Sequence, residues 1–129
     1  APIAQKAGLC EIVTTTGKTI SGVILNCEID LESPLFWGFS ENALQVFKQK
    51  ATVYSCEKGS TPMKYSKDPY ISGYTTPEII DNFRGGQAII THKVGKGRLI
   101  FFANEMNFRS YWYSTSKVFA NAILYGGLI

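Results

Sequence analysis

The sequence predicts an α/β domain, in which a mixed β-sheet is combined with a short middle helix and a C-terminal helix. Residues 22–29 alternate apolar and polar side chains, which is the period of a half-buried strand. Residues 75–86 and 114–126 each start at a hydroxyl residue and end at glycine, as capped helices do. With 129 residues, of which 45% are hydrophobic, the chain is long enough for one domain with a substantial core.

The first half of the chain is predicted to consist of short strands separated by turns. Residues 1–16 show no clear period, so we expect a lead-in there and a single domain over residues 17–129. The strand Gly22–Ile29 has a predicted buried face of Val23, Leu25, Cys27 and Ile29. Further strands are predicted at Leu44–Phe47, Ala51–Ser55, Met63–Tyr65 and Tyr70–Ile71. The first of these also fits one turn of helix, because Ser40 and Asn42 are suitable caps.

A short helix is predicted after Thr75, followed by a β-hairpin. Thr75 is the expected N-cap and Glu78 the acid of a capping box, while Gly85 ends the helix. The buried face of this helix is predicted to be Ile79, Ile80 and Phe83. Strands over Gln87–Lys93 and Arg98–Ala103 follow, joined by a glycine turn. The second strand is apolar on both faces, so we expect it to be central in the sheet and covered on both sides.

The final helix is predicted over Thr115–Tyr125. Ser114 or Ser116 is expected to cap its start, and Gly126 to stop it. Its core stripe is predicted to be Val118, Phe119, Ala122 and Ile123. The loop before this helix follows a strand, and open α/β sheets place their ligand crevices at such loops.

The loop Asn104–Trp112 carries the densest set of binding-type side chains. The candidate ligand-binding residues are Asn104, Asn107, Arg109 and Trp112. Arg109 can hold an oxyanion through two parallel hydrogen bonds. In the alternative, structural interpretation, Arg109 pairs with an internal acid such as Asp30 or Glu105, and Asn107 ties the backbone of the loop. No catalytic residues are predicted here.

Charge and composition argue against two kinds of partner. The net charge of +3 comes from scattered basic residues, so no patch for nucleic acid is predicted. No apolar run approaches the roughly 18 residues that span a bilayer, so no membrane span is expected. Residues 1–8 do not resemble a signal peptide. Because the chain starts at alanine, we expect a processed product or a piece of a longer protein.

The cysteines and the single histidine do not form a metal or catalytic set. Cys10, Cys27 and Cys56 show no CxxC spacing, so no metal or cofactor is expected in this chain. One disulfide with one thiol, or three reduced thiols, both fit this count. A thiol hydrolase that uses Cys27 and His92 is disfavoured, because Cys27 lies in mid-strand without the sharp turn that exposes a nucleophile. We therefore expect that this chain is not an enzyme.

Three segments carry a resemblance to a known family. They are Ile20–Phe39, Tyr70–Tyr74 and Gly95–Gly126, the last of which begins G-K-G-R-L-I-F-F-A-N-E-M-N-F-R-S. In this order they resemble the C-terminal region of large bacterial zinc carboxypeptidases of the carboxypeptidase A type. The resemblance implies part of a class I glutamine amidotransferase-like, flavodoxin-like domain. It also implies a periplasmic, cell-envelope or extracellular parent, in which zinc and the catalytic glutamate belong to a separate N-terminal peptidase domain absent from these residues.

Two functions follow as expectations. The first is a non-catalytic C-terminal accessory domain of a secreted zinc metallocarboxypeptidase-like protein, which packs against the peptidase domain or presents substrate to it. The second is a free-standing binding module for a peptide carboxylate or a glycan. Since a partial sheet has exposed edges, pairing with another copy in a homodimer is one way to cover them.

Overall fold

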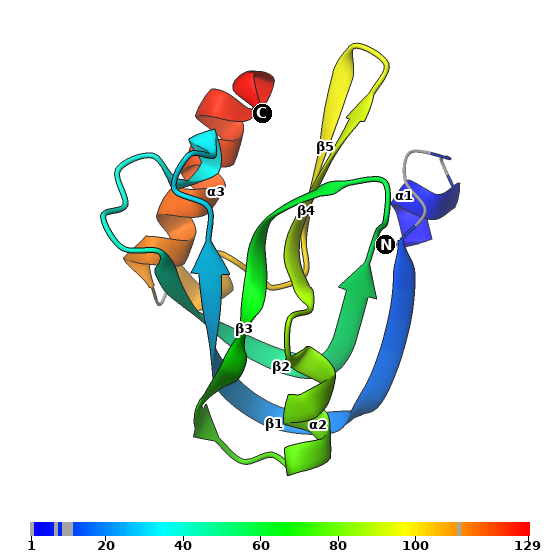
Figure 1. Cartoon of the computed structure of the whole chain (residues 1–129), viewed down its shortest axis with the longest axis vertical. Coiled ribbons are helices and arrows are strands. Elements are labelled where there is room, and N and C mark those ends of the chain that lie inside the picture. Colours follow the sequence, from blue (N-terminus) through cyan, green and yellow to red (C-terminus); the bar gives the residue numbers. More distant parts are fainter. Residues whose placement is uncertain (1, 7, 9–11, 111) are drawn as a thin grey trace.

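Three helices and five strands make up the part of the chain that the computed structural model describes, which is residues 2–6, 8, 12–110 and 112–129 (Figure 1). The helices are α1 (Pro2–Lys6), α2 (Pro77–Phe83) and α3 (Tyr113–Tyr125). The strands are β1 (Val13–Ile29), β2 (Ala43–Ser55), β3 (Ser60–Gly73), β4 (Gln87–Val94) and β5 (Gly97–Phe102). Short 3-10 turns are η1 (Pro34–Phe36), η2 (Phe108–Ser110) and η3 (Gly126–Leu128). The predicted combination of helices and a sheet is confirmed.

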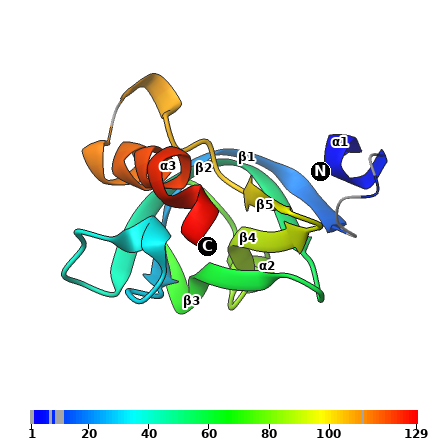
Figure 2. The same cartoon turned by 90° about the horizontal axis from the view of Figure 1, so that it is seen from above.

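The five strands form one sheet in the order β2-β1-β3-β4-β5. A further contact between β2 and β4, at Tyr54 and Gln87, joins the two ends of the β2-β1-β3-β4 run. These four strands therefore curve into a ring, which is seen from above in Figure 2. Every described pairing is antiparallel, so the expectation of a mixed sheet is wrong. The tightest connection between paired strands is the two-residue turn between β4 and β5, which suits antiparallel partners.

Strands β2 and β3 are each continuous where the sequence predicted two short strands. The segment Lys48–Lys50, expected as a turn, instead continues β2, because β1 pairs with β2 along nearly the whole length of both strands. Leu25 of β1 faces Tyr70 of β3, and Cys27 faces Tyr65. One residue of β1 therefore lies opposite the four residues Ser66–Pro69, which form a bulge in β3. The same long pairing extends β1 back to Val13, into the expected lead-in.

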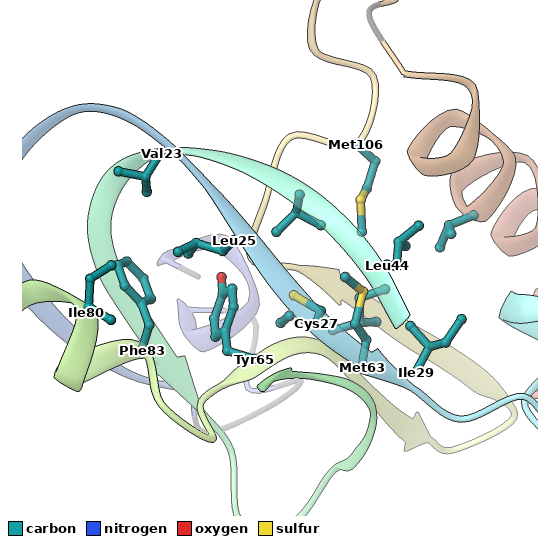
Figure 3. Packing of buried hydrophobic residues seen from close by; sticks show 14 of the residues in the cluster. Val23, Leu25, Cys27, Ile29, Leu44, Met63, Tyr65, Ile80, Phe83 and Met106 are labelled. Atoms are coloured by element: carbon teal, nitrogen blue, oxygen red, sulfur yellow. The ribbon is translucent and has the colours of Figure 1, made fainter. Parts of the chain in front are cut away.

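The core lies inside the ring and confirms the predicted inner face of β1. Val23, Leu25, Cys27 and Ile29 are all buried, and they meet Met63 and Tyr65 from β3 (Figure 3). The ring of Tyr65 packs edge-on against Phe83 of α2, with 5.2 Å between ring centroids. Cys56 is also buried, in a second small cluster with Ile12 and Ile90. Cys10 lies outside the described residues.

Helix α2 matches its predicted buried face but not its predicted cap. Ile79, Ile80 and Phe83 are all buried against the core. The N-cap is Thr76 rather than Thr75, and its side chain makes no capping hydrogen bond. Pro77 occupies the first helical position, where its fixed φ favours the helix and its missing N–H costs nothing. The proline therefore sets the start of α2 in place of a capping box.

Strand β5 is at the edge of the sheet rather than at its centre. It pairs only with β4, across a turn in which Gly95 adopts a φ of 58°. Its two apolar faces nevertheless each meet a cluster. Ile100 and Phe102 pack against the main core, whereas Leu99 and Phe101 pack against the second cluster. Apolar residues on both faces thus reflect two separate clusters, and the prediction of a central strand is wrong.

Helix α3 begins at Tyr113, two residues earlier than predicted, with Trp112 rather than a serine at the N-cap. Its buried face also differs from the predicted stripe. Val118 is fully buried, but Phe119 and Ile123 are 38% and 70% exposed. The cause is Asn121, which is buried and donates hydrogen bonds from Nδ2 to the carbonyl oxygens of Leu35 and Trp37, at 2.9 and 3.1 Å.

Candidate functional site

The loop between β5 and α3 borders a groove that is largely apolar. The groove has a volume of about 310 Å³. It is lined by Ile24, Val46, Phe47, Asn104, Glu105, Met106, Phe108, Arg109, Trp112 and Thr115. Met106 fixes the loop from within, because its side chain is buried in the core (Figure 3). Phe108 packs on Phe47 of β2, with 5.0 Å between ring centroids. These two contacts hold the loop against the strands.

Three of the four predicted binding residues, Asn104, Arg109 and Trp112, line this one groove. Asn107 does not line it, and its side chain is exposed. No described hydrogen bond joins the Asn107 side chain to the loop backbone, which the structural interpretation required.

Asn104 lines the groove and has a buried donor without a partner among the described residues. The residue is 8% exposed, and its Oδ1 accepts a hydrogen bond from the hydroxyl of Tyr65 at 3.0 Å. Its Nδ2 is buried and has no hydrogen-bond partner in the described part of the chain. A buried amide nitrogen without a partner costs about 1–3 kcal/mol. A ligand oxygen that accepted from Nδ2 would recover this cost.

Arg109 brings a cation to the same groove. Its guanidinium lies over the ring of Phe108, 5.3 Å from the centroid. It makes no ion pair with Asp30, Glu105 or any other described residue, so these residues give the structural interpretation of this side chain no support. Its backbone is left-handed, with φ 50° and ψ 25°, which is unusual for a residue with a side chain. Such strain is concentrated at functional sites in proteins.

The start of α3 adds a further positive element. Trp112 and Thr115, which flank the first turn of the helix, both line the groove. The positive end of the helix dipole therefore adjoins it, and this favours a negatively charged group. Glu105 is an exposed carboxylate on the rim and acts in the opposite direction.

A second hollow lies beside the groove and contains a residue that the sequence analysis missed. It measures about 330 Å³, shares Asn104 with the groove and is lined also by Lys48. Lys48 is 4% exposed and follows Leu44 and Val46 on the inner face of β2. Its position two residues after Val46 is the signal for an inward side chain, but the predicted strand Leu44–Phe47 stops one residue short of it.

The geometry gives little support to a thiol hydrolase that uses Cys27 and His92. Cys27 is fully buried, and burial raises the pKa of its thiol far above the ordinary value, which disfavours the nucleophilic thiolate. His92 lies in β4, where it pairs with Leu99. Within the described ranges, no group of three or more His, Cys, Asp or Glu residues is placed to hold a metal ion. Among the same residues, no helix has the length and apolarity that crossing a membrane requires.

Comparison of the chain with protein-family models, with curated protein sequences and with solved structures found no match. The assignment of the site therefore depends on the chemistry and geometry of the groove itself.

Proposed function

We propose that this chain is a non-catalytic binding module whose groove holds an apolar group that carries a carboxylate. The observation that carries the proposal is the pairing of two unused polar groups at one apolar groove. Among the residues that the structure describes, Asn104 has a buried donor without a partner and Arg109 has a guanidinium without an ion pair. Arginine and amide donors suit a carboxylate, while the aromatic and aliphatic lining suits an apolar side chain.

The C-terminal end of a peptide has both of these features. Its terminal carboxylate would meet Arg109 and Asn104, and an aromatic or branched last side chain would enter the apolar part of the groove. The volume of about 310 Å³ is at the lower end of the range for small-ligand sites, which suits one large side chain.

We also propose a parent protein for this module, on the basis of the resemblance carried by Ile20–Phe39, Tyr70–Tyr74 and Gly95–Gly126. The parent is a secreted zinc metallocarboxypeptidase-like protein, in which the module is an accessory domain that presents peptide ends to the peptidase domain. The flavodoxin-like part of that resemblance finds no support in the sheet, because flavodoxin-like domains are built on parallel strands and the described pairings here are antiparallel. Residues encoded before Ala1 test the proposed parent: an H-x-x-E motif with a distant histidine supports it, and their absence contradicts it.

Calorimetric titration of the purified chain tests the binding itself. The probe is a tetrapeptide that ends in phenylalanine with a free carboxylate, and its C-terminal amide is the matched control. We expect the acid to bind at least about tenfold more tightly than the amide, because a charged hydrogen-bonded pair contributes about 1.5–3 kcal/mol. Equal binding of both peptides, or of neither, would overturn the proposal.

Arg109→Gly sharpens this test without endangering the fold. Glycine adopts a φ of 50° freely, so the substitution removes the guanidinium and also relieves the backbone strain. The acid peptide should then bind no better than the amide. Arg98→Ala is the control, because Arg98 is an exposed arginine of β5 that does not line the groove.

A further inference from the structure

Lys48 is a buried amine that lacks a carboxylate partner among the described residues. Its Nζ donates one hydrogen bond, of 2.7 Å, to the carbonyl oxygen of Ala103. The rings of Tyr54, Tyr65 and Phe83 surround it, with 5.6–6.0 Å between Nζ and their centroids. Buried lysines are usually paired with an acid, so the absence of such a pair is unusual.

The amine is also next to open space. The hollow of about 330 Å³ is lined by Lys48, by aromatic residues and by polar residues, among them Gln49, Thr52 and Glu105. Its partly aromatic and partly polar walls suit a flat aromatic molecule of modest size that carries a polar group. Asn104 also lines this hollow, and its Nδ2 has no hydrogen-bond partner among the described residues.

Burial lowers the pKa of Lys48 to about 8, because the ammonium form loses its hydration; the nearby Cys27 acts in the opposite direction. The other titratable groups that face this amine are Tyr54 and Tyr65, while Lys50 and Glu105 line the same hollow. At pH 7 a lysine of this kind is in the neutral, nucleophilic form far more often than an exposed one.

We propose that Lys48 is a covalent capture site for small aromatic aldehydes that enter this hollow. The amine nitrogen attacks the carbonyl carbon and forms a C–N bond, and the carbonyl oxygen leaves as water with both amine hydrogens. The product is an imine between Lys48 and the aldehyde carbon, and no oxidant or reductant is consumed. Asn104 would donate to the oxygen as the tetrahedral intermediate forms. This is reversible binding and implies no turnover.

Reductive trapping tests the proposal. The chain is incubated at pH 7 with 4-hydroxybenzaldehyde and sodium cyanoborohydride, whose hydride converts the imine into a stable secondary amine. Peptide mass spectrometry then follows each lysine over time. We expect Lys48 to be modified at least about tenfold faster than Lys96, an exposed lysine of the turn between β4 and β5 that does not line the hollow. Labelling of Lys48 no faster than Lys96 would overturn the proposal.

Two variants make the test specific. Lys48→Arg keeps the positive charge but cannot form the imine, so the fast phase of labelling should vanish, whereas Lys96→Arg, outside the hollow, should leave it unchanged. If Lys48→Arg fails to fold, the lysine-by-lysine rates of the unaltered chain still decide. Raising the pH from 7 to 9 should reduce the ratio of the labelling rate of Lys48 to that of Lys96, and an unchanged ratio would contradict the assignment. The outcome does not depend on peptide binding at Arg109, so the two proposals can fail separately.

Discussion

Helices α2 and α3 both pack on the strands, but they are held in opposite ways. Helix α2 buries three apolar side chains and has no side-chain hydrogen bond at its cap. Helix α3 leaves Ile123 and Leu124 largely exposed and is held through Asn121 and Lys117, which donate to backbone carbonyls of residues 35–38. Hydrophobic burial therefore places α2, whereas α3 depends on directional hydrogen bonds in addition to the buried Val118.

This difference bears on the site. The first turn of α3 forms part of the groove, through Trp112 and Thr115, whereas α2 lines neither hollow. Where proteins bind ligands, their sequences often depart from the local rules of packing and polarity that hold elsewhere in the fold. The exposed apolar face of α3 and its attachment through hydrogen bonds fit this pattern. They predict that replacing a hydrogen-bonding residue of α3 disturbs the groove more than replacing a buried apolar residue of the core does.

The largest expected effect is on α2. Phe83→Ala should lower the free energy of unfolding by about 3–5 kcal/mol, because it opens a cavity beside Tyr65 and removes a fully buried ring. Urea unfolding followed by circular dichroism measures this. A loss below about 1 kcal/mol would mean that burial does not hold α2 in place.

A smaller loss is expected on α3. Asn121→Ala should cost about 1–3 kcal/mol, because two carbonyl oxygens lose a buried donor. It should also weaken binding of the acid peptide, since the helix start borders the groove. Lys117→Ala, which removes one exposed contact to Gly38, is the matched control and should cost less. An Asn121→Ala variant as stable as the unaltered chain would contradict the polar attachment of α3.

The pH dependence of stability tests the burial of Lys48, whose amine lies 5.8 Å from the ring centroid of Phe83 of α2. The pKa of Lys48 is lowered by burial in the folded chain, so between pH 8 and 10.5 the unfolded chain binds more protons and stability rises with pH. Burial raises the pKa of Cys27 and Tyr65, and these groups therefore act in the opposite direction above about pH 9. The difference in unfolding free energy between the unaltered chain and Lys48→Met isolates the lysine. It should rise by about 1 kcal/mol from pH 7 to 9, and a flat difference would contradict the burial of the ammonium.

The smallest effect is expected on the exposed face of α3. Ile123→Ser should change the free energy of unfolding by less than about 0.5 kcal/mol, because the side chain is mostly exposed. The same thermal or urea denaturation measures it. A loss comparable to that of Asn121→Ala would show that Ile123 is covered, for instance by a second copy of the chain, and sedimentation would then report a dimer.

The sequence by itself determined the features that depend on short spacing. The inner face of β1, the buried face of α2 and the glycine turn before β5 were all predicted, because periodicity and turn chemistry act over a few residues. The loop of the candidate groove was also predicted, since its polar and aromatic residues follow one another directly along the chain.

Only the tertiary structure decided which residues became neighbours across the sheet. Long pairing with β1 carried β2 through Lys48, and closure of the ring placed that amine among three aromatic rings. The carbonyls of Leu35 and Trp37 likewise turned α3 so that Asn121, rather than Ile123, faces inward. Contacts between residues tens of positions apart leave no local period in the sequence, so they become visible only once the strands have paired.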